Sequence, residues 1–222
     1  MRNLYQEQLE NLNQELIRMG AACEEIIDLA ARALTEYTPE LEEKTKQVGA
    51  VIDESERTIE TICLKLLLRQ QPVAGDLRQI SAALKMITDM ERIGDQAEDI
   101  AEIVGYLEGC GEAHCALLSA MARAAIRMVT DSVDAYVKQD VALAEAVIAH
   151  DDVVDDYFGQ VKNSLIQMIA QTPANGGFAL DLLMISKYFE RIGDHATNIA
   201  EWVIFSVTGV HKSEELNREQ SI

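Results

Sequence analysis

The chain has 222 residues and a formal net charge of −19 at pH 7. Such a surface repels a phosphodiester backbone, so direct binding to nucleic acid is not expected. Hydrophobic residues make up 48% of the sequence, with 3 prolines and 5% aromatic residues, a composition typical of long helices and not of a β-sandwich. No apolar run reaches the ~18–20 residues of a membrane-spanning helix. We therefore predict a soluble cytoplasmic protein without membrane insertion.

Apolar residues recur at three- and four-residue steps along most of the chain, which predicts long amphipathic helices. Six are expected, over residues 3–37, 39–69, 76–106, 113–138, 140–170 and 178–207. Thr38 and Pro39 provide the start signals of the second helix, and Asp140 is expected to cap the fifth. Short connections make sequential helices antiparallel.

Glycines between residues 105 and 111 mark a boundary near the middle of the chain. The predicted fold is all-α, with six long helices in two tandem antiparallel three-helix bundles. The first bundle is expected over residues 1–108, the second over 113–210, and a polar C-terminal tail over 211–222.

A short acidic segment occurs in the third helix and again in the sixth. Glu-Arg-Ile-Gly-Asp occupies residues 91–95 and returns at residues 190–194, an offset of 190 − 91 = 99. On an ideal helix with Glu91 at zero, Asp95 lies near ~40° and Asp99 near ~80°. Five acids share this stripe: Glu91, Asp95, Glu98, Asp99 and Glu102. The apolar residues lie on the opposite side, so the stripe is predicted to face outward.

The second stripe contains Glu190, Asp194, Asn198 and Glu201. Thr197 and Asn198 stand where the first repeat has Glu98 and Asp99, so this stripe carries two fewer negative charges. A hard cation is therefore expected to bind it more weakly.

The stripes could be ordinary solvated helix faces, but two features favour a ligand. Acidic residues spaced at i, i+4 repel one another by ~0.2–0.5 kcal/mol per pair, and no Lys stands within either stripe. Gly94 and Gly193 lie within helices at a cost of about 1 kcal/mol each relative to Ala. A glycine at such a position suggests close approach of another helix or of a ligand. Carboxylates spaced in this way suit Mg²⁺, Mn²⁺ or an oxygen-bridged iron cluster.

Two acids on the preceding helices are candidates to complete such a shell. Asp53 in the second helix and Asp151 in the fifth stand at equivalent repeat positions, with 151 − 53 = 98. For both residues, helix capping or pairing with Arg57, Arg92 or Arg191 is an equally weighted alternative.

Four cysteines are present, at positions 23, 63, 110 and 115. Cys23 and Cys63 lie within helical patterns and are predicted to be small buried hydrophobic residues. Cys110 and Cys115 flank His114, but no second ligand pair lies near them. Reduced thiols in a linker are therefore preferred to a zinc site.

The repeated motif resembles that of the PhoU family of phosphate-specific transport system accessory proteins. The resemblance includes Gln70-Gln71-Pro72, Asp76-Leu77-Arg78, Asp53 and Asp151, and it covers nearly the whole chain. It implies a cytoplasmic, homodimeric, non-enzymatic regulator. It also implies multinuclear metal clusters on the bundle surface, held through Glu/Asp-x-x-x-Asp, here Glu91 with Asp95 and Glu190 with Asp194.

The metal is implied to be Mg, Mn, Fe or Zn. The resemblance implies negative regulation of the phosphate-starvation response. The implied partners are the ATPase subunit of the high-affinity phosphate ABC transporter and the membrane sensor histidine kinase of the response. From the residues, the candidate ligands are Glu91, Asp95, Asp99, Glu190, Asp194 and Asn198, with Asp53 and Asp151 from neighbouring helices and Glu102 and Glu201 as outer ligands.

Two alternatives stay open from sequence. A ferritin-like carboxylate metalloenzyme requires inward Glu residues and Glu-x-x-His pairs, whereas Glu91 and Glu190 are each followed by glycine at i+3. A plain helical scaffold would bind no metal. No Gly-rich phosphate loop or Gly-x-Ser-x-Gly motif is present.

Overall fold

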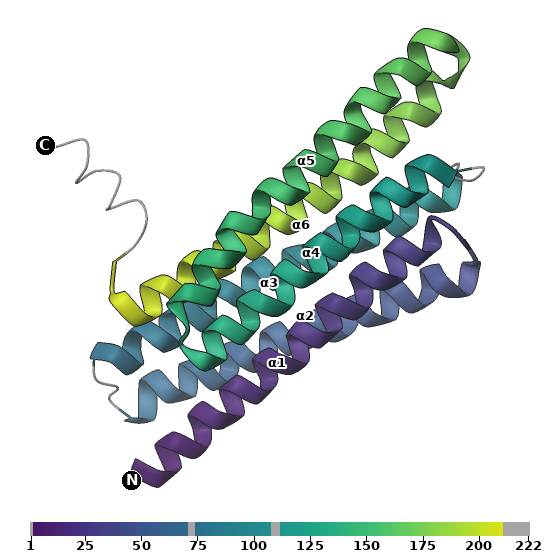
Figure 1. Cartoon of the computed structure of the whole chain (residues 1–222). Coiled ribbons are helices and arrows are strands. Elements are labelled where there is room, and N and C mark those ends of the chain that lie inside the picture. The colour runs from purple at the N-terminus through teal and green to yellow at the C-terminus, as the bar shows by residue number, and fades with distance from the viewer. Residues whose placement is uncertain (1, 71–73, 108–111, 211–222) are drawn as a thin grey trace, which may run out of the picture.

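The computed structural model describes residues 2–70, 74–107 and 112–210, and these form long helices joined by short turns. The bounds are α1 Arg2–Ala33, α2 Pro39–Gln70, α3 Ala74–Tyr106, α4 Glu112–Lys138, α5 Val141–Gln171, the short 3₁₀ helix η1 Pro173–Asn175 and α6 Gly176–Thr208. The predicted all-α fold of six long helices is confirmed (Figure 1). Among the helices of these described residues, none has an apolar stretch of the length that spans a bilayer.

Local signals account for most of the helix boundaries. The Thr38 hydroxyl accepts a hydrogen bond from the Leu41 amide at 3.2 Å, at the start of α2. Asp140 accepts one from the Leu143 amide at 3.0 Å, which confirms it as the cap of α5. The first helix ends at Ala33, four residues earlier than expected. The turn that follows brings the Tyr37 hydroxyl within 2.6 Å of a Glu42 carboxylate oxygen, a contact that a continued helix would not allow.

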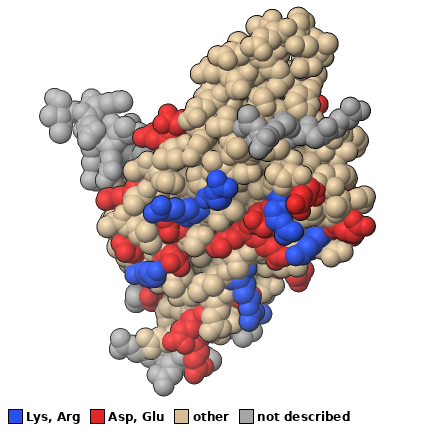
Figure 2. Space-filling model, turned by 45° about the vertical axis from the view of Figure 1, so that its right-hand side comes forward, with Lys and Arg blue, Asp and Glu red and all other residues tan. Residues whose placement is uncertain are grey.

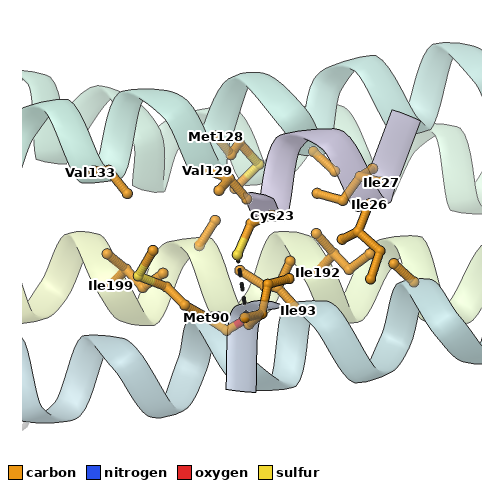
Figure 3. Packing of buried hydrophobic residues seen from close by; sticks show 14 of the residues in the cluster. Cys23, Ile26, Ile27, Met90, Ile93, Met128, Val129, Val133, Ile192 and Ile199 are labelled. Carbon is orange, nitrogen blue, oxygen red and sulfur yellow. Dashed lines mark hydrogen bonds between the residues drawn. The ribbon is translucent and has the colours of Figure 1, made fainter. Parts of the chain in front are cut away.

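The two halves of the chain pack together along α3 and α6, which form the most extensive helix pair. A second contact joins α1 to α4. Buried apolar residues from both halves form one continuous core, which Figure 3 shows around Cys23 and Met90. The Cys23 thiol donates to the Met90 carbonyl at 3.5 Å. Cys23 is buried, as predicted. The proposed domain limits remain a prediction, since the core runs through both halves.

The helices α3 and α6 run antiparallel, and two polar pairs define their register. Asn198 donates to Asp89 at 3.1 Å, and Tyr188 lies close enough to Asp99 for the two side chains to shift each other's pKa. These pairs are mates in the repeat, since 188 − 89 = 99 and 198 − 99 = 99. The repeated halves are therefore related by an approximate two-fold axis between α3 and α6.

Candidate metal centre

The first acidic cluster lies along the seam between α2 and α3. It comprises carboxylates from both helices that act on one another electrostatically: Asp53 and Glu56 from α2, and Glu91, Asp95 and Glu98 from α3. Burial raises the pKa of Glu91, and the charges of Asp95, Glu56 and Asp53 add to the effect. Burial also raises the pKa of Glu98, with Asp53 the largest charge contribution. The structure thus places Asp53 beside the first motif.

The second acidic cluster lies along the equivalent seam between α5 and α6. Its members are Asp151 and Asp155 from α5, and Glu190 and Asp194 from α6. Burial, followed by repulsion from Asp155, Asp194 and Glu190, raises the pKa of Asp151 to about 6. Burial and the charge of Glu190 likewise raise the pKa of Asp194.

Asp151 has the least satisfied carboxylate in either cluster. Its Oδ1 atom is buried and has no hydrogen-bond partner in the described part of the chain. Both Asp53 and Asp151 lie well inside their helices, which excludes helix capping. Among the described residues, neither forms an ion pair, and Arg57 lies instead 3.7 Å from Glu54. A buried carboxylate oxygen facing other acids is one that a cation would stabilise.

The motif carboxylates have basic neighbours that the stripe pattern did not predict. Arg92 lies 3.4 Å from Glu91 (Nε to Oε2) and 3.0 Å from Asp95 (Nη1 to Oδ2). In the second half, Lys187 pairs with Glu190. The stripes contain no Lys, but they still have positive charge beside them, because Arg92 and Lys187 approach from adjacent helix positions.

The predicted outward orientation of the stripes needs correction. The Glu91 side chain is only 22% exposed and that of Glu190 only 14%, against 46% for Asp95. The carboxylates therefore lie in half-buried seams. On Figure 2, acidic atoms form an interrupted band with Lys and Arg atoms beside it.

The two motif glycines explain this burial. A Cβ added to Gly94 would lie 3.1 Å from Ile52 Cδ1 on α2. A Cβ on Gly193 would lie 3.1 Å from Asp151 Oδ1 on α5. The predicted close approach of another helix is confirmed at both positions. The preceding helix covers the glycine side of each motif, and Gly193 leaves room for the Asp151 carboxylate.

Asp99 and Asn198 lie on the α3–α6 seam, where Asp99 still acts electrostatically on Asp95 and Glu98 of the first cluster. The Asn198 amide donates to Asp89 at 3.1 Å, and the same Asp89 oxygen lies 2.8 Å from His195 Nδ1. Burial raises the pKa of Asp99, while the nearby Tyr188 side chain opposes that rise. These two candidate ligands are thus engaged in contacts between the halves. His195 thus lies between α6 and α3.

The two outer candidates, Glu102 and Glu201, lie nearer the C-terminal ends of their helices. Glu102 is exposed. Glu201 lines a separate hollow of about 280 Å³ between the start of α5 and the end of α6, together with Glu145 and Ile148. The structure therefore places Glu201 beside this hollow, about 10 Å along the helix from Asp194 at 1.5 Å per residue.

The cysteine-rich stretch gives no zinc site in the described residues. His114 Nε2 lies 3.2 Å from the Ser164 hydroxyl, and the Cys115 thiol donates to the Leu34 carbonyl at 3.3 Å. Cys115 lies in α4 and not in a linker as expected, whereas Cys110 falls outside the described residues.

Across the described ranges, no three His, Cys, Asp or Glu side chains already form a ligand set for a metal ion. Binding would therefore require carboxylates of a cluster to turn toward a shared ion. The sequence interpretation also overlooked Glu56, Asp89 and Lys187. Glu56 stands at i+3 from Asp53 and could have been found from helical spacing, but Asp89 could not, since its partners lie more than 100 residues away.

The geometry defines a class of protein: a duplicated three-helix bundle in which each copy carries an acidic seam beside a buried glycine. A family model described as the PhoU domain matches this chain twice, over residues 16–104 and 118–203. The chain belongs to the PhoU family.

Two relatives match over nearly their full lengths. A "Phosphate-specific transport system accessory protein PhoU homolog" from Clostridium acetobutylicum is 34% identical over 97% of this chain and 99% of its own. A protein of the same description from Synechocystis is 36% identical over 94% and 93%. The crystal structure of PhoU from Pseudomonas aeruginosa superposes with a TM-score of 0.86 at 31% identity, covering 93% of this chain and all of that one.

Proposed function

We propose that this protein is a non-enzymatic accessory regulator of a phosphate transport system. The observation that carries the proposal is the full-length similarity to phosphate-specific transport system accessory proteins. In this proposal the protein acts in the cytoplasm as a homodimer. It contacts the ATPase subunit of the phosphate ABC transporter and the membrane sensor histidine kinase, and it represses the phosphate-starvation response.

We further propose that the two acidic clusters bind metal ions. The fit rests on the unpartnered Oδ1 of Asp151 and on the mutual repulsion among the carboxylates. Glu91, Asp95 and Asp53 would hold metal in the first cluster, and Glu190, Asp194 and Asp151 in the second. When bound, Mg, Mn, Fe or Zn would neutralise the repulsion and supply positive charge on a surface that is otherwise acidic.

The chain's own residues give these seams two properties. Gly94 and Gly193 keep α2 and α5 close, so that carboxylates of two helices share each seam. Arg92 and Lys187 hold some of them by ion pairs in the absence of another cation. A change in cation occupancy would therefore alter how each helix pair presents its charges to a partner.

A ferritin-like oxidase has less support. Such a site needs carboxylate and histidine ligands inside the bundle. Among the described residues, the buried polar side chains are Thr45, Gln96, Ser132, Ser186 and Ser206, with no Asp, Glu or His. Oxygen consumption by the iron-loaded protein would revive this alternative.

The regulatory proposal is tested by deleting the gene and by measuring binding to the purified transporter and to the cytoplasmic part of the sensor kinase. We expect expression of phosphate-starvation genes in phosphate-rich medium. Normal repression in the deletion strain would contradict the regulatory role.

The metal proposal is tested separately by elemental analysis of protein purified without chelator. A metal content near zero, after incubation with each of the four metals, would leave the plain helical scaffold as the better description.

A further inference from the structure

The tip of the α5–α6 hairpin differs from the rest of the molecule in carrying no charge. Residues 163–180 include no Asp, Glu, Lys, Arg or His, although 26% of the chain is charged. The equivalent tip of the first half, residues 65–81, carries Lys65, Arg69, Asp76 and Arg78. The lack of charge is therefore a property of one copy and not of the repeat. We call residues 163–180 the uncharged tip, and Asp181 is the first charged residue after it.

The uncharged tip also projects from the body of the protein. Figure 1 shows the α5–α6 hairpin extending beyond the neighbouring ends of α3 and α4. The first turn of α4 contacts α5 at Ser164, through His114, so α5 continues for two further turns past this contact. In Figure 2 the upper part of the projecting lobe carries neither red nor blue atoms.

Large apolar side chains are exposed on both helices of the uncharged tip. Ile166 is 58% exposed and Leu180 59%, and Met184, one turn beyond Leu180 on α6, is 45% exposed. Exposed apolar area costs about 25 cal/mol per Å² relative to burial. Contact here removes apolar atoms from water without stripping water from a charged group, which is the costly step elsewhere on this acidic surface.

We propose that the uncharged tip docks into a concave apolar groove, free of charged groups, on the phosphate ABC transporter. This inference rests on the proposed accessory function. A protein of net charge −19 meets another macromolecule with little electrostatic cost at a projection that carries no charge. A helix pair inserted into a groove buries its apolar side chains on several sides, as amphipathic helices do in partner grooves.

Two other occupants fit the shape and charge less well. A second copy would place one convex tip against another, and two convex surfaces touch over a small area. A stable interface buries ~1,200–2,000 Å² in total, which disfavours a second copy as the occupant. A bilayer with anionic lipids attracts basic residues, and the uncharged tip contains no Lys or Arg.

The test compares two variants of the full chain. In I166E/L180E, a charge replaces each of two exposed side chains, so folding should be retained and is checked by thermal melting. In L68E, the control, the same change is made on the charged tip of the first half, where Leu68 is 83% exposed. Binding is measured by biolayer interferometry to the phosphate ABC transporter of the same organism in nanodiscs. We expect I166E/L180E to weaken binding at least tenfold and L68E to leave it within twofold.

Each outcome separates this inference from the function on which it rests. If the wild type binds the transporter and I166E/L180E binds equally well, the docking site is wrong and the accessory function stands. If the wild type does not bind, both are wrong. Equal binding to protein-free nanodiscs would identify lipid as the occupant. Loss of a dimer in light scattering, with transporter binding unchanged, would identify a second copy. Either result overturns the proposal.

Discussion

The two acidic clusters occupy equivalent seams but balance their charges differently. In the first, Arg92 lies between Glu91 and Asp95, and Glu98 adds a carboxylate from the same helix. In the second, Thr197 replaces Glu98, and Asp151 has a buried oxygen that accepts no hydrogen bond from the described residues. The duplicated motif therefore preserves the helix geometry, whereas the neighbouring residues determine how each copy would hold a cation.

Glu98 shows how the first cluster uses space provided by α2. Its carboxylate occupies the position that a Cβ on Gly49 would need. The repeat equivalent of Gly49 is Val147, since the offset of 98 between Asp53 and Asp151 gives 49 + 98 = 147. The second half has neither the glycine nor the glutamate, so the two changes are linked by packing.

The largest expected effect comes from removing motif carboxylates. E91Q/D95N should reduce the affinity of the first cluster for Mn²⁺ at least a hundredfold, which is ~2.8 kcal/mol, because two charged oxygen ligands are lost. E190Q/D194N should do the same to the second cluster. E190Q/D194N keeps the first cluster and E91Q/D95N keeps the second. Titration calorimetry should show tighter Mn²⁺ binding by E190Q/D194N, because the first seam has more carboxylates. The reverse order would contradict the sequence-based ranking.

The next largest effect tests the helix contacts at the glycines. G94V and G193V should each lower the free energy of unfolding by about 2 kcal/mol through overpacking. For a chain of this length that corresponds to a melting temperature ~4–8 °C lower. G159V is the matched control, since a Cβ on Gly159 meets no atom within 4 Å. Equal melting temperatures for all three variants would mean that the seams are looser than described.

A smaller effect on stability tests whether Asn198 serves the contact between α3 and α6 or binds metal. N198D replaces the amide that donates to Asp89 with a second carboxylate. We expect a loss of about 1 kcal/mol in stability at pH 7.5, comparable to a lost hydrogen bond plus repulsion. Affinity for Mn²⁺ should not rise. A clear gain in affinity would instead support the sequence-based assignment of position 198 to the metal site.

The smallest effect concerns Asp151 and pH. Its pKa is raised to about 6 by burial and neighbouring acids, so the folded state binds a proton more readily than the unfolded state. Stability of the metal-free protein should therefore fall as pH rises from about 4 to 6.5. D151N should remove this component and gain ~1 kcal/mol or less at pH 7.5, since partial exposure weakens the effect. The pH dependence of the wild type and the gain in D151N are both measured by chemical denaturation at pH 5 and pH 7.5, with EDTA present to remove metal. D156N, at an exposed position on α5, is the control variant. A wild-type stability that rises over this pH range would contradict the assignment.

Much of the fold could be predicted because its signals are local. Thr38 and Asp140 cap helices through side chains next to the helix start, and the 99-residue offset revealed the repeat. The placement of Asp53 beside the first motif and Asp151 beside the second also followed from equivalent positions in the repeat. The close approach of helices at Gly94 and Gly193 followed from the cost of glycine within a helix.

The orientation of the stripes could not be predicted from one helix alone. A helix wheel shows which side is apolar, but the angle at which α2 and α5 pack decides how far Glu91 and Glu190 are covered. The placement of Asn198 depends on α3 meeting α6, a contact between residues more than 100 positions apart. Asn198 became a candidate ligand because motif spacing describes positions on one helix and contains no information about the neighbouring helix.

The polar pairs on the α3–α6 seam have a consequence for how the duplicated halves could assemble. Asp89 faces Asn198, and Asp99 faces Tyr188. If two first halves met through the same helix face, Asp89 of one would stand opposite Asp99 of the other, and two carboxylates would meet in a half-buried site. The halves have diverged into complementary surfaces, so a fragment of residues 1–107 cannot rebuild the molecule by pairing with itself, whereas it retains the surface that recognises the second half.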